Sequence, residues 1–179
     1  MRLIAFFIEI LPLAGFFIGF ELGGIFTAAV VSSILGVTLM ALTWLKEGRL
    51  ALFPFYSVVL AAVFTILALL MDAAVFIKIQ PTVFNGGFAL VLLGGVMRGT
   101  AMMKRFFGAQ FDLTEDVWMT LSLRWGLFFT VMAVANEIAW RQLDDAGWVW
   151  MKTFVFAPTS GVFMLAQLPI TLRGRKTET

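Results

Sequence analysis

The 179-residue chain contains neither cysteine nor histidine. Without cysteine it can form no disulfide bond, no thiolate nucleophile and no cysteine-based metal site. Without histidine it lacks the commonest metal ligand and the commonest general base. Nothing in the sequence resembles a phosphate-binding loop, a metal cluster or a catalytic triad. We therefore expect no enzymatic activity, no catalytic residue, no bound metal and no cofactor.

Charged residues are also scarce, at 13% of the chain against about 25% in soluble domains. The formal net charge is only +2, so no nucleic acid is expected as a partner. Hydrophobic residues make up 61% of the chain, and the mean hydropathy is +0.97. A chain this apolar is expected to be an all-α integral membrane protein, with the lipid bilayer as its first partner.

Long apolar runs predict a polytopic bundle of transmembrane helices that forms a single membrane domain over residues 1–179. The five clear spans are expected at 25–45, 51–71, 80–97, 117–140 and 151–172. Ahead of them, residues 3–20 form an N-terminal apolar segment. As a helix it reaches about 27 Å, which is marginal for a bilayer core of about 30 Å. This segment is either a sixth span or a re-entrant or interfacial one.

Small residues recur at helical spacing in the first part of the chain. Gly15, Gly19 and Gly23 follow one another at intervals of four, and Ala28, Ser32 and Gly36 repeat the pattern in the next span. Such stripes let two helices approach closely, either within the chain or in a homo-oligomer. Glu21 and the pair Gly23–Gly24 are expected to end the N-terminal run.

The span at 80–97 is preceded by a polar segment. Lys78, Thr82 and Asn85 lie three and four residues apart, so on a helix they share one stripe. Pro81 suits the first turn of that helix, where its missing N–H costs nothing. A related pattern begins the last span, because FIKIQPT at 76–82 and WMKTFVFAPT at 150–159 both place a lysine ahead of Pro-Thr.

Polar groups inside the apolar spans are the candidate site residues, because such groups are costly in lipid. Arg124 and Glu137 lie about 20 Å apart along one helix, so each needs a partner on another element. Lys78 is a plausible partner for Glu137 or Asp72, or a simple interfacial anchor. The full set of candidates is Lys78, Thr82, Asn85, Asn136, Glu137, Glu9 and Arg124.

Two interpretations of this set stay open. The polar side chains hold the bundle together by interhelical hydrogen bonds, each worth roughly 0.6 to 2 kcal/mol. Alternatively, Lys78, Asn85, Asn136 and Glu137 line one polar cavity that opens to the outer face. For Glu9 and Arg124, snorkelling of the charged group to the membrane interface is a further explanation.

The longest polar segment, 98–116, mixes charged residues with phenylalanines and is expected to be a cytoplasmic amphipathic loop on the membrane surface. Basic residues gather on one side of the predicted bundle, which places the C-terminus in the cytoplasm. The inner set is Lys46, Arg49, Arg98, Lys104, Arg105, Arg173, Arg175 and Lys176, and the outer set is Lys78, Arg141 and Lys152.

Several short motifs, spread in order over nearly the whole chain, resemble the bacterial intracellular septation protein A family. They are Glu9-Ile10-Leu11-Pro12-Leu13, Phe76-Ile77-Lys78 with Pro81-Thr82 and Asn85, Phe88 with Leu92-Leu93-Gly94, Trp118 with Leu121, Leu123, Trp125 and Phe128-Phe129, Ala135-Asn136-Glu137 with Trp140, and Trp148-Val149 with Lys152-Thr153-Phe154. The resemblance implies a multi-pass protein of the bacterial inner membrane, linked to septation, envelope maintenance and contacts with division and envelope-synthesis membrane proteins. It supplies no catalytic residues.

Two hypotheses about function follow. The first is an inner-membrane protein of cell division and envelope maintenance that acts through protein–protein contacts, with loops 46–49 and 98–117 meeting its partners. The alternative is a small transporter, channel or lipid-handling protein with a polar site on the outer half of the bundle, where proline-interrupted helices would be compatible with such a site.

Overall fold

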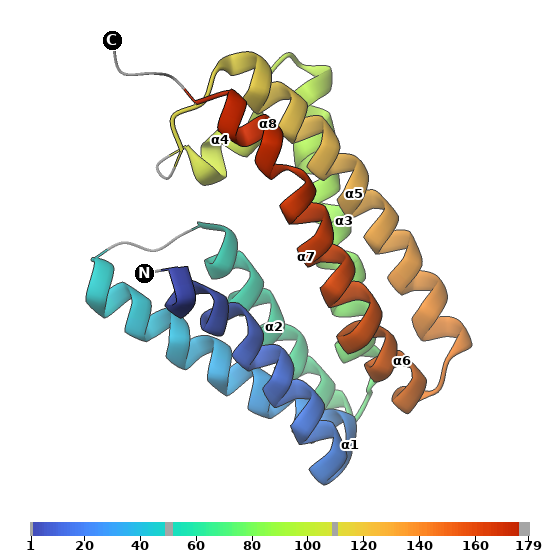
Figure 1. Ribbon diagram of the computed structural model, residues 1–179. Helices are drawn as coiled ribbons and strands as arrows, with labels where there is room; N and C mark the ends of the chain where they lie inside the picture. The colour runs from blue at the N-terminus through green and yellow to red at the C-terminus, as the bar shows by residue number, and fades with distance from the viewer. Residues whose placement is uncertain (1, 49–51, 109–110, 176–179) are drawn as a thin grey trace. The chain divides into compact units, whose positions relative to one another are not determined.

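The computed structural model describes residues 2–48, 52–108 and 111–175, with the backbone alone for residues 2–10 and 47. Within these ranges the chain is almost entirely helical and has no strand, which confirms the all-α class (Figure 1). The elements are α1 (Arg2–Glu47), α2 (Leu52–Met71), α3 (Val75–Met97), α4 (Met102–Phe107), α5 (Glu115–Gln142), α6 (Asp145–Met151), the π-helical turn η1 (Lys152–Phe156), α7 (Ala157–Ala166) and α8 (Leu168–Arg173).

Five helical stretches are long and apolar enough to cross a membrane, which confirms the prediction of a polytopic helical protein. They are Leu11–Lys46, Leu52–Met71, Val75–Met97, Glu115–Gln142 and Asp145–Arg173. Many of their large apolar side chains are exposed, among them Leu90 and Met97 at 78% and 84%. A water-soluble protein would bury such residues, whereas lipid is a favourable environment for them.

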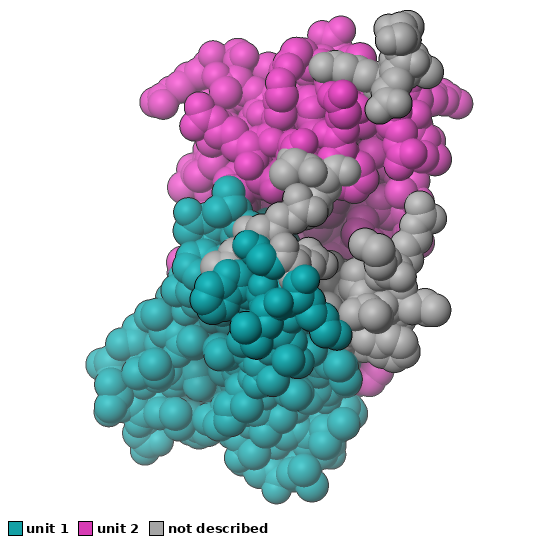
Figure 2. All heavy atoms as spheres, turned by 90° about the vertical axis from the view of Figure 1, so that its left-hand side faces the viewer, with its two compact units in different colours: residues 1–80, 139–153 teal, residues 81–138, 154–179 magenta. Residues whose placement is uncertain are grey.

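The chain divides by packing into two compact units, coloured separately in Figure 2. The first unit contains residues 1–80 and 139–153, and the second contains residues 81–138 and 154–179. Helices α3 and α5 contribute residues to both units. That the chain makes a single membrane domain stays a prediction.

In the first unit, α1 is a helical hairpin rather than one straight rod. Its backbone reverses at Gly23 and Gly24, and Gly24 has φ of 77°, a conformation that favours glycine. Figure 1 shows the two arms of α1 side by side, in dark and light blue. The N-terminal apolar segment is therefore an antiparallel partner of the span that follows it.

Close approach of the two arms depends on the first glycine stripe. A methyl group placed on Gly19 would lie 2.9 Å from the Cα atom of Ala28, and one on Gly15 would collide with Leu35. This confirms that Gly15 and Gly19 let a neighbouring helix approach. Gly23 is different, because its nearest neighbour is Thr27 at the reversal. In the second stripe, Gly36 faces Val58 of α2.

The rest of the first unit packs on this hairpin. Ser33 of α1 and Thr65 of α2 share a hydrogen bond of 2.9 Å between their hydroxyls. Helix α6 begins at a capping residue, Asp144, whose carboxylate accepts a 2.8 Å hydrogen bond from the backbone N–H of Gly147. Trp148 of α6 is fully buried and meets Phe16 of α1 edge to face, with ring centroids 6.0 Å apart.

In the second unit, the core is built mainly from aromatic rings of α3, α5 and α7. Phe128 of α5 stacks on Phe163 of α7 with ring centroids 4.1 Å apart. Phe88 of α3 meets Phe129 of α5 at 5.9 Å and Phe106 of α4 at 5.3 Å. Aromatic contacts of this kind add to the stabilisation from buried area.

Two local features differ from what the sequence predicts. Helix α3 begins at Val75 rather than at residue 80, because the chain turns at Asp72, with φ of 49°, and the helix restarts three residues later. Pro81 therefore lies inside the helix and not in its first turn, so the first-turn prediction is wrong. In the polar segment 98–116, only α4 is helical ahead of α5, and Met103 and Phe106 of α4 pack on the protein itself.

Candidate functional site

Three of the predicted polar residues meet in the second unit, between α3 and α5. The side-chain amide of Asn136 donates a 2.9 Å hydrogen bond to the Thr82 hydroxyl. The same hydroxyl donates to a carboxylate oxygen of Glu137 at 3.2 Å. A hydroxyl can accept and donate at once, so Thr82 connects two side chains that point from adjacent positions of α5.

This Thr82–Asn136–Glu137 cluster lies at a helix–helix contact. Asn136 is only 1% exposed, and Thr82 and Glu137 are half-buried. A buried amide without a hydrogen bond would cost free energy, and the Thr82 hydroxyl removes that cost. The cluster therefore ties α3 to α5 through polar contacts in an otherwise apolar interface.

Asn85 is not part of this cluster. Its side-chain amide donates a 2.7 Å hydrogen bond to the backbone carbonyl of Pro81, one turn earlier in α3. The amide thus bonds within its own helix rather than across to another one. The acceptor is the carbonyl of the interior proline itself, and the helical hydrogen-bond pattern is interrupted one turn earlier, because the proline has no N–H to donate there.

Lys78 lies in the first unit, where its ammonium forms an ion pair with Asp145 at 2.6 Å. The lysine side chain is 15% exposed and that of the aspartate 43%. This pair connects the first turns of α3 to the first turn of α6. The sequence predicts a polar loop at Asp145, so this residue is not among the predicted partners of Lys78. In the structure Asp145 is the first residue of α6.

The last two candidates lie apart from the cluster. Arg124 is exposed on α5 and donates a 3.3 Å hydrogen bond to the side-chain oxygen of Gln167, which is 7% exposed. It therefore has a partner on another element, as its position on the helix required. The side chain of Glu9 lies outside the described residues.

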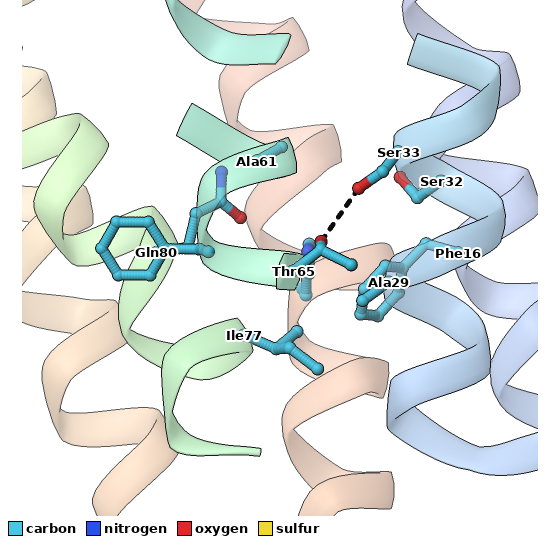
Figure 3. Close-up of a pocket in the computed structure, with 10 residues that line it drawn as sticks. Phe16, Ala29, Ser32, Ser33, Ala61, Thr65, Ile77 and Gln80 are labelled. Atoms are coloured by element: carbon cyan, nitrogen blue, oxygen red, sulfur yellow. Dashed lines mark hydrogen bonds between the residues drawn. The ribbon is translucent and has the colours of Figure 1, made fainter. Parts of the chain in front are cut away.

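Among the polar residues outside the predicted set, Ser122 is buried and Lys152 is half-buried. Ser122 is fully buried, accepts a 3.1 Å hydrogen bond from the backbone N–H of Met103 and donates to the carbonyl of Trp118. It thereby fixes α4 on α5. Lys152, counted only as an outer charge, lines a small cavity in the first unit (Figure 3). The similarity between residues 76–82 and 150–159 aligns Lys152 with Lys78. This similarity is the feature of the sequence that points to Lys152.

Comparison with known proteins decides the family. A sequence model described as intracellular septation protein A matches residues 4–178. The chain belongs to this family. The inner membrane-spanning protein YciB of Agrobacterium fabrum is 36% identical over 154 residues, covering 86% of this chain and 76% of that protein. That of Sinorhizobium fredii is 37% identical over 154 residues, covering 86% and 73%. No solved structure is a significant match.

Within this family member, the described polar contacts connect helices. In the part of the chain that the structure describes, no group of three or more acidic, cysteine or histidine side chains could hold a metal ion. The carboxylate of Glu137 accepts a hydrogen bond from Thr82. The Thr82–Asn136–Glu137 cluster thus links α3 to α5.

Proposed function

We propose that this protein acts without catalysis in septation and envelope maintenance, through contacts with division and envelope-synthesis proteins of the inner membrane. The family description, intracellular septation protein A, supports the process. The relatives' name, inner membrane-spanning protein, supports the location. The five long apolar helices agree with both.

The observation that carries the proposal is the internal use of the Thr82–Asn136–Glu137 cluster. Asn136 donates to Thr82, and Thr82 donates to Glu137, so these hydrogen bonds join two of the protein's own helices. The cavity in the first unit is lined by none of Lys78, Asn85, Asn136 and Glu137. We infer that those four residues serve packing within the protein rather than a transport site.

Partner contacts then fall to the exposed parts of the chain. In α4, Met103 and Phe106 face the protein core, while Lys104 and Arg105 are exposed. The C-terminus and this helix lie on the cytoplasmic side in our proposal, following the excess of basic residues there. A fixed helix with an exposed basic pair is a suitable contact for a partner with acidic cytoplasmic residues.

The test is complementation of a bacterium that lacks its own family member and shows a division or envelope defect. Arg105→Glu is expected to leave the yield of folded protein unchanged and to lose complementation. Arg105→Lys keeps the charge and is expected to complement. If Arg105→Glu complements fully, α4 is not the contact surface.

A second set of variants, at Glu137 and Lys78, separates a packing role of these residues from a role in a polar site. Glu137→Gln and Lys78→Ala, singly and together, are expected to lower folded yield and complementation in parallel. Folded, abundant protein that fails to complement would contradict the proposal and favour a ligand-handling site instead.

A further inference from the structure

The first unit contains a small cavity that is lined by more hydrogen-bond donors than its own side chains use. Its volume is about 30 Å³, and α1, α2, α3 and η1 all contribute to it (Figure 3). Its polar side chains are Ser32, Ser33, Thr65, Gln80 and Lys152. The remaining lining is apolar, which lowers the local dielectric and strengthens any charge interaction inside.

Among the described residues of this lining, Lys152 supplies the cationic group. Its ammonium nitrogen lies 3.8 Å from the ring centroid of Phe16 and 5.0 Å from that of Trp148. Ring faces attract a cation, but they do not take its N–H groups as an oxygen acceptor does. Within the described residues Lys152 forms no ion pair with a carboxylate. A half-buried ammonium that faces rings and has no carboxylate partner among the described residues gains from an anionic partner.

The neighbouring side chains add further donors. Ser33 and Thr65 share a single hydrogen bond, drawn as the dashed line in Figure 3, so one of their two hydroxyl hydrogens remains for a third group. The hydroxyl of Ser32 and the amide of Gln80 line the same space, and neither has a hydrogen bond to another described side chain. Hydrogen-bond donors of α1, α2 and α3 thus line the same cavity as the Lys152 ammonium of η1.

We propose that this cavity binds an oxyanion group, either a phosphate or a carboxylate, with Lys152 as the counter-charge. Serine and glutamine side chains then donate to the oxygens that the ammonium does not reach. The aromatic faces of Phe16 and Trp148 hold the ammonium in position from the other side.

The size of the cavity limits what enters. A volume of 30 Å³ is about that of one water molecule in the liquid, so one end of an oxyanion fits and a whole solute does not. The rest of the ligand stays outside the cavity. An anionic lipid headgroup and a free phosphate or carboxylate share this chemistry, so the experiment has to distinguish the two sources.

The first measurement is thermal unfolding of the detergent-purified protein, followed by tryptophan fluorescence. Sodium phosphate and sodium acetate are titrated at constant ionic strength. The matched variants are Lys152→Met and Lys46→Met, since Lys46 is an exposed lysine at the end of α1. We expect the wild type and Lys46→Met to be stabilised to the same extent. Lys152→Met should need about ten times more anion, because a charge-assisted hydrogen bond is lost.

The second measurement places the same variants in lipid nanodiscs that contain phosphatidylethanolamine with or without phosphatidylglycerol. Stabilisation by phosphatidylglycerol alone, dependent on Lys152, identifies a lipid headgroup as the source. Stabilisation by the soluble anions identifies a free solute, and either result supports the site. Gln80→Leu keeps Lys152 and is expected to weaken the stabilisation by anions in part. It replaces Lys152→Met as the test variant if Lys152→Met does not fold.

The proposal is overturned if neither the soluble anions nor phosphatidylglycerol stabilise the wild type. It is also overturned if Lys152→Met and Gln80→Leu both respond as the wild type does. An internal counter-charge or a trapped water molecule would then be the occupant of the cavity. This test is independent of the septation proposal, because it reads binding and not complementation.

Discussion

Thr82 shows how one small side chain can determine the contact between two membrane helices. Its hydroxyl accepts from Asn136 and donates to Glu137, so removing a single oxygen deprives both partners of a hydrogen bond. Lipid offers no replacement for either bond. Thr82 thus links two longer side chains of α5 to α3.

Thr82→Val, which keeps the shape of the side chain, is expected to lower the free energy of unfolding by about 0.6 to 1.7 kcal/mol. Reversible unfolding by a denaturing detergent measures the change. Thr120→Val is the control, because Thr120 bonds only to the carbonyl of Asp116 within α5. Equal losses in the two variants would mean that the cluster adds nothing beyond helix propensity.

The two ion pairs found among the described residues differ in exposure, and we expect their strengths to differ in the same order. Lys78 and Asp145 are 15% and 43% exposed, whereas Lys104 and Glu115 are 48% and 67% exposed. A double-mutant cycle with Lys78→Met and Asp145→Asn is expected to give a coupling of up to about 1 kcal/mol. The same cycle with Lys104→Met and Glu115→Gln should give a smaller value. A larger coupling for the exposed pair would contradict this ranking.

At the scale of single elements, the glycine stripe of α1 makes the sharpest prediction. Gly19→Ala puts a methyl group against the backbone of Ala28, which cannot move as a flexible side chain would. We expect a loss of roughly 1 to 3 kcal/mol from this overpacking. Gly94→Ala on α3 meets no atom within 4 Å and should instead gain about 0.4 to 1 kcal/mol.

Opposite signs for the same substitution therefore test the packing of the hairpin. The measurement is again the free energy of unfolding in detergent. If Gly19→Ala stabilises the protein as Gly94→Ala does, the two arms of α1 do not approach as closely as their glycines allow.

The sequence predicts the helices well because the apolar runs are long and the bilayer sets their length. Pro81 in the sequence favours a helix start near residue 80, whereas α3 begins at Val75. The turn at Asp72 that precedes the helix has no comparable signal in the sequence. The Thr82 stripe and the pair Asn136–Glu137 were recognisable as costly groups in lipid. Which of them meet depends on the register of α3 against α5, and hydropathy contains no information on register.

Lys152 was missed for a related reason. A count of basic residues on each side of the membrane treats Lys152 only as an outer lysine. Such a count ignores that Lys152 lies beyond Trp148 within the helical stretch Asp145–Arg173. The cavity around it needs four elements that are distant in the chain. Only the folded first unit brings them together.

At the scale of the whole molecule, the absence of cysteine makes the proposed topology easy to test. Leu143→Cys, in the turn between α5 and α6, is expected to react with a membrane-impermeant maleimide added to intact spheroplasts. Arg105→Cys on α4 should react only after the membrane is opened. The wild type is the blank, and the reverse pattern would place the C-terminus outside.

The reversal at Gly23–Gly24 also bears on how the protein is made. Gly19 and Ala28 lie close in space and are only about nine residues apart in the chain, so closing the hairpin fixes a short loop and costs little chain entropy. Its two arms leave the ribosome before α2 to α8 exist to compete for their surfaces. We expect the hairpin to form before the helices that follow it. Helix α2, and later α6, would then assemble on a surface already in place.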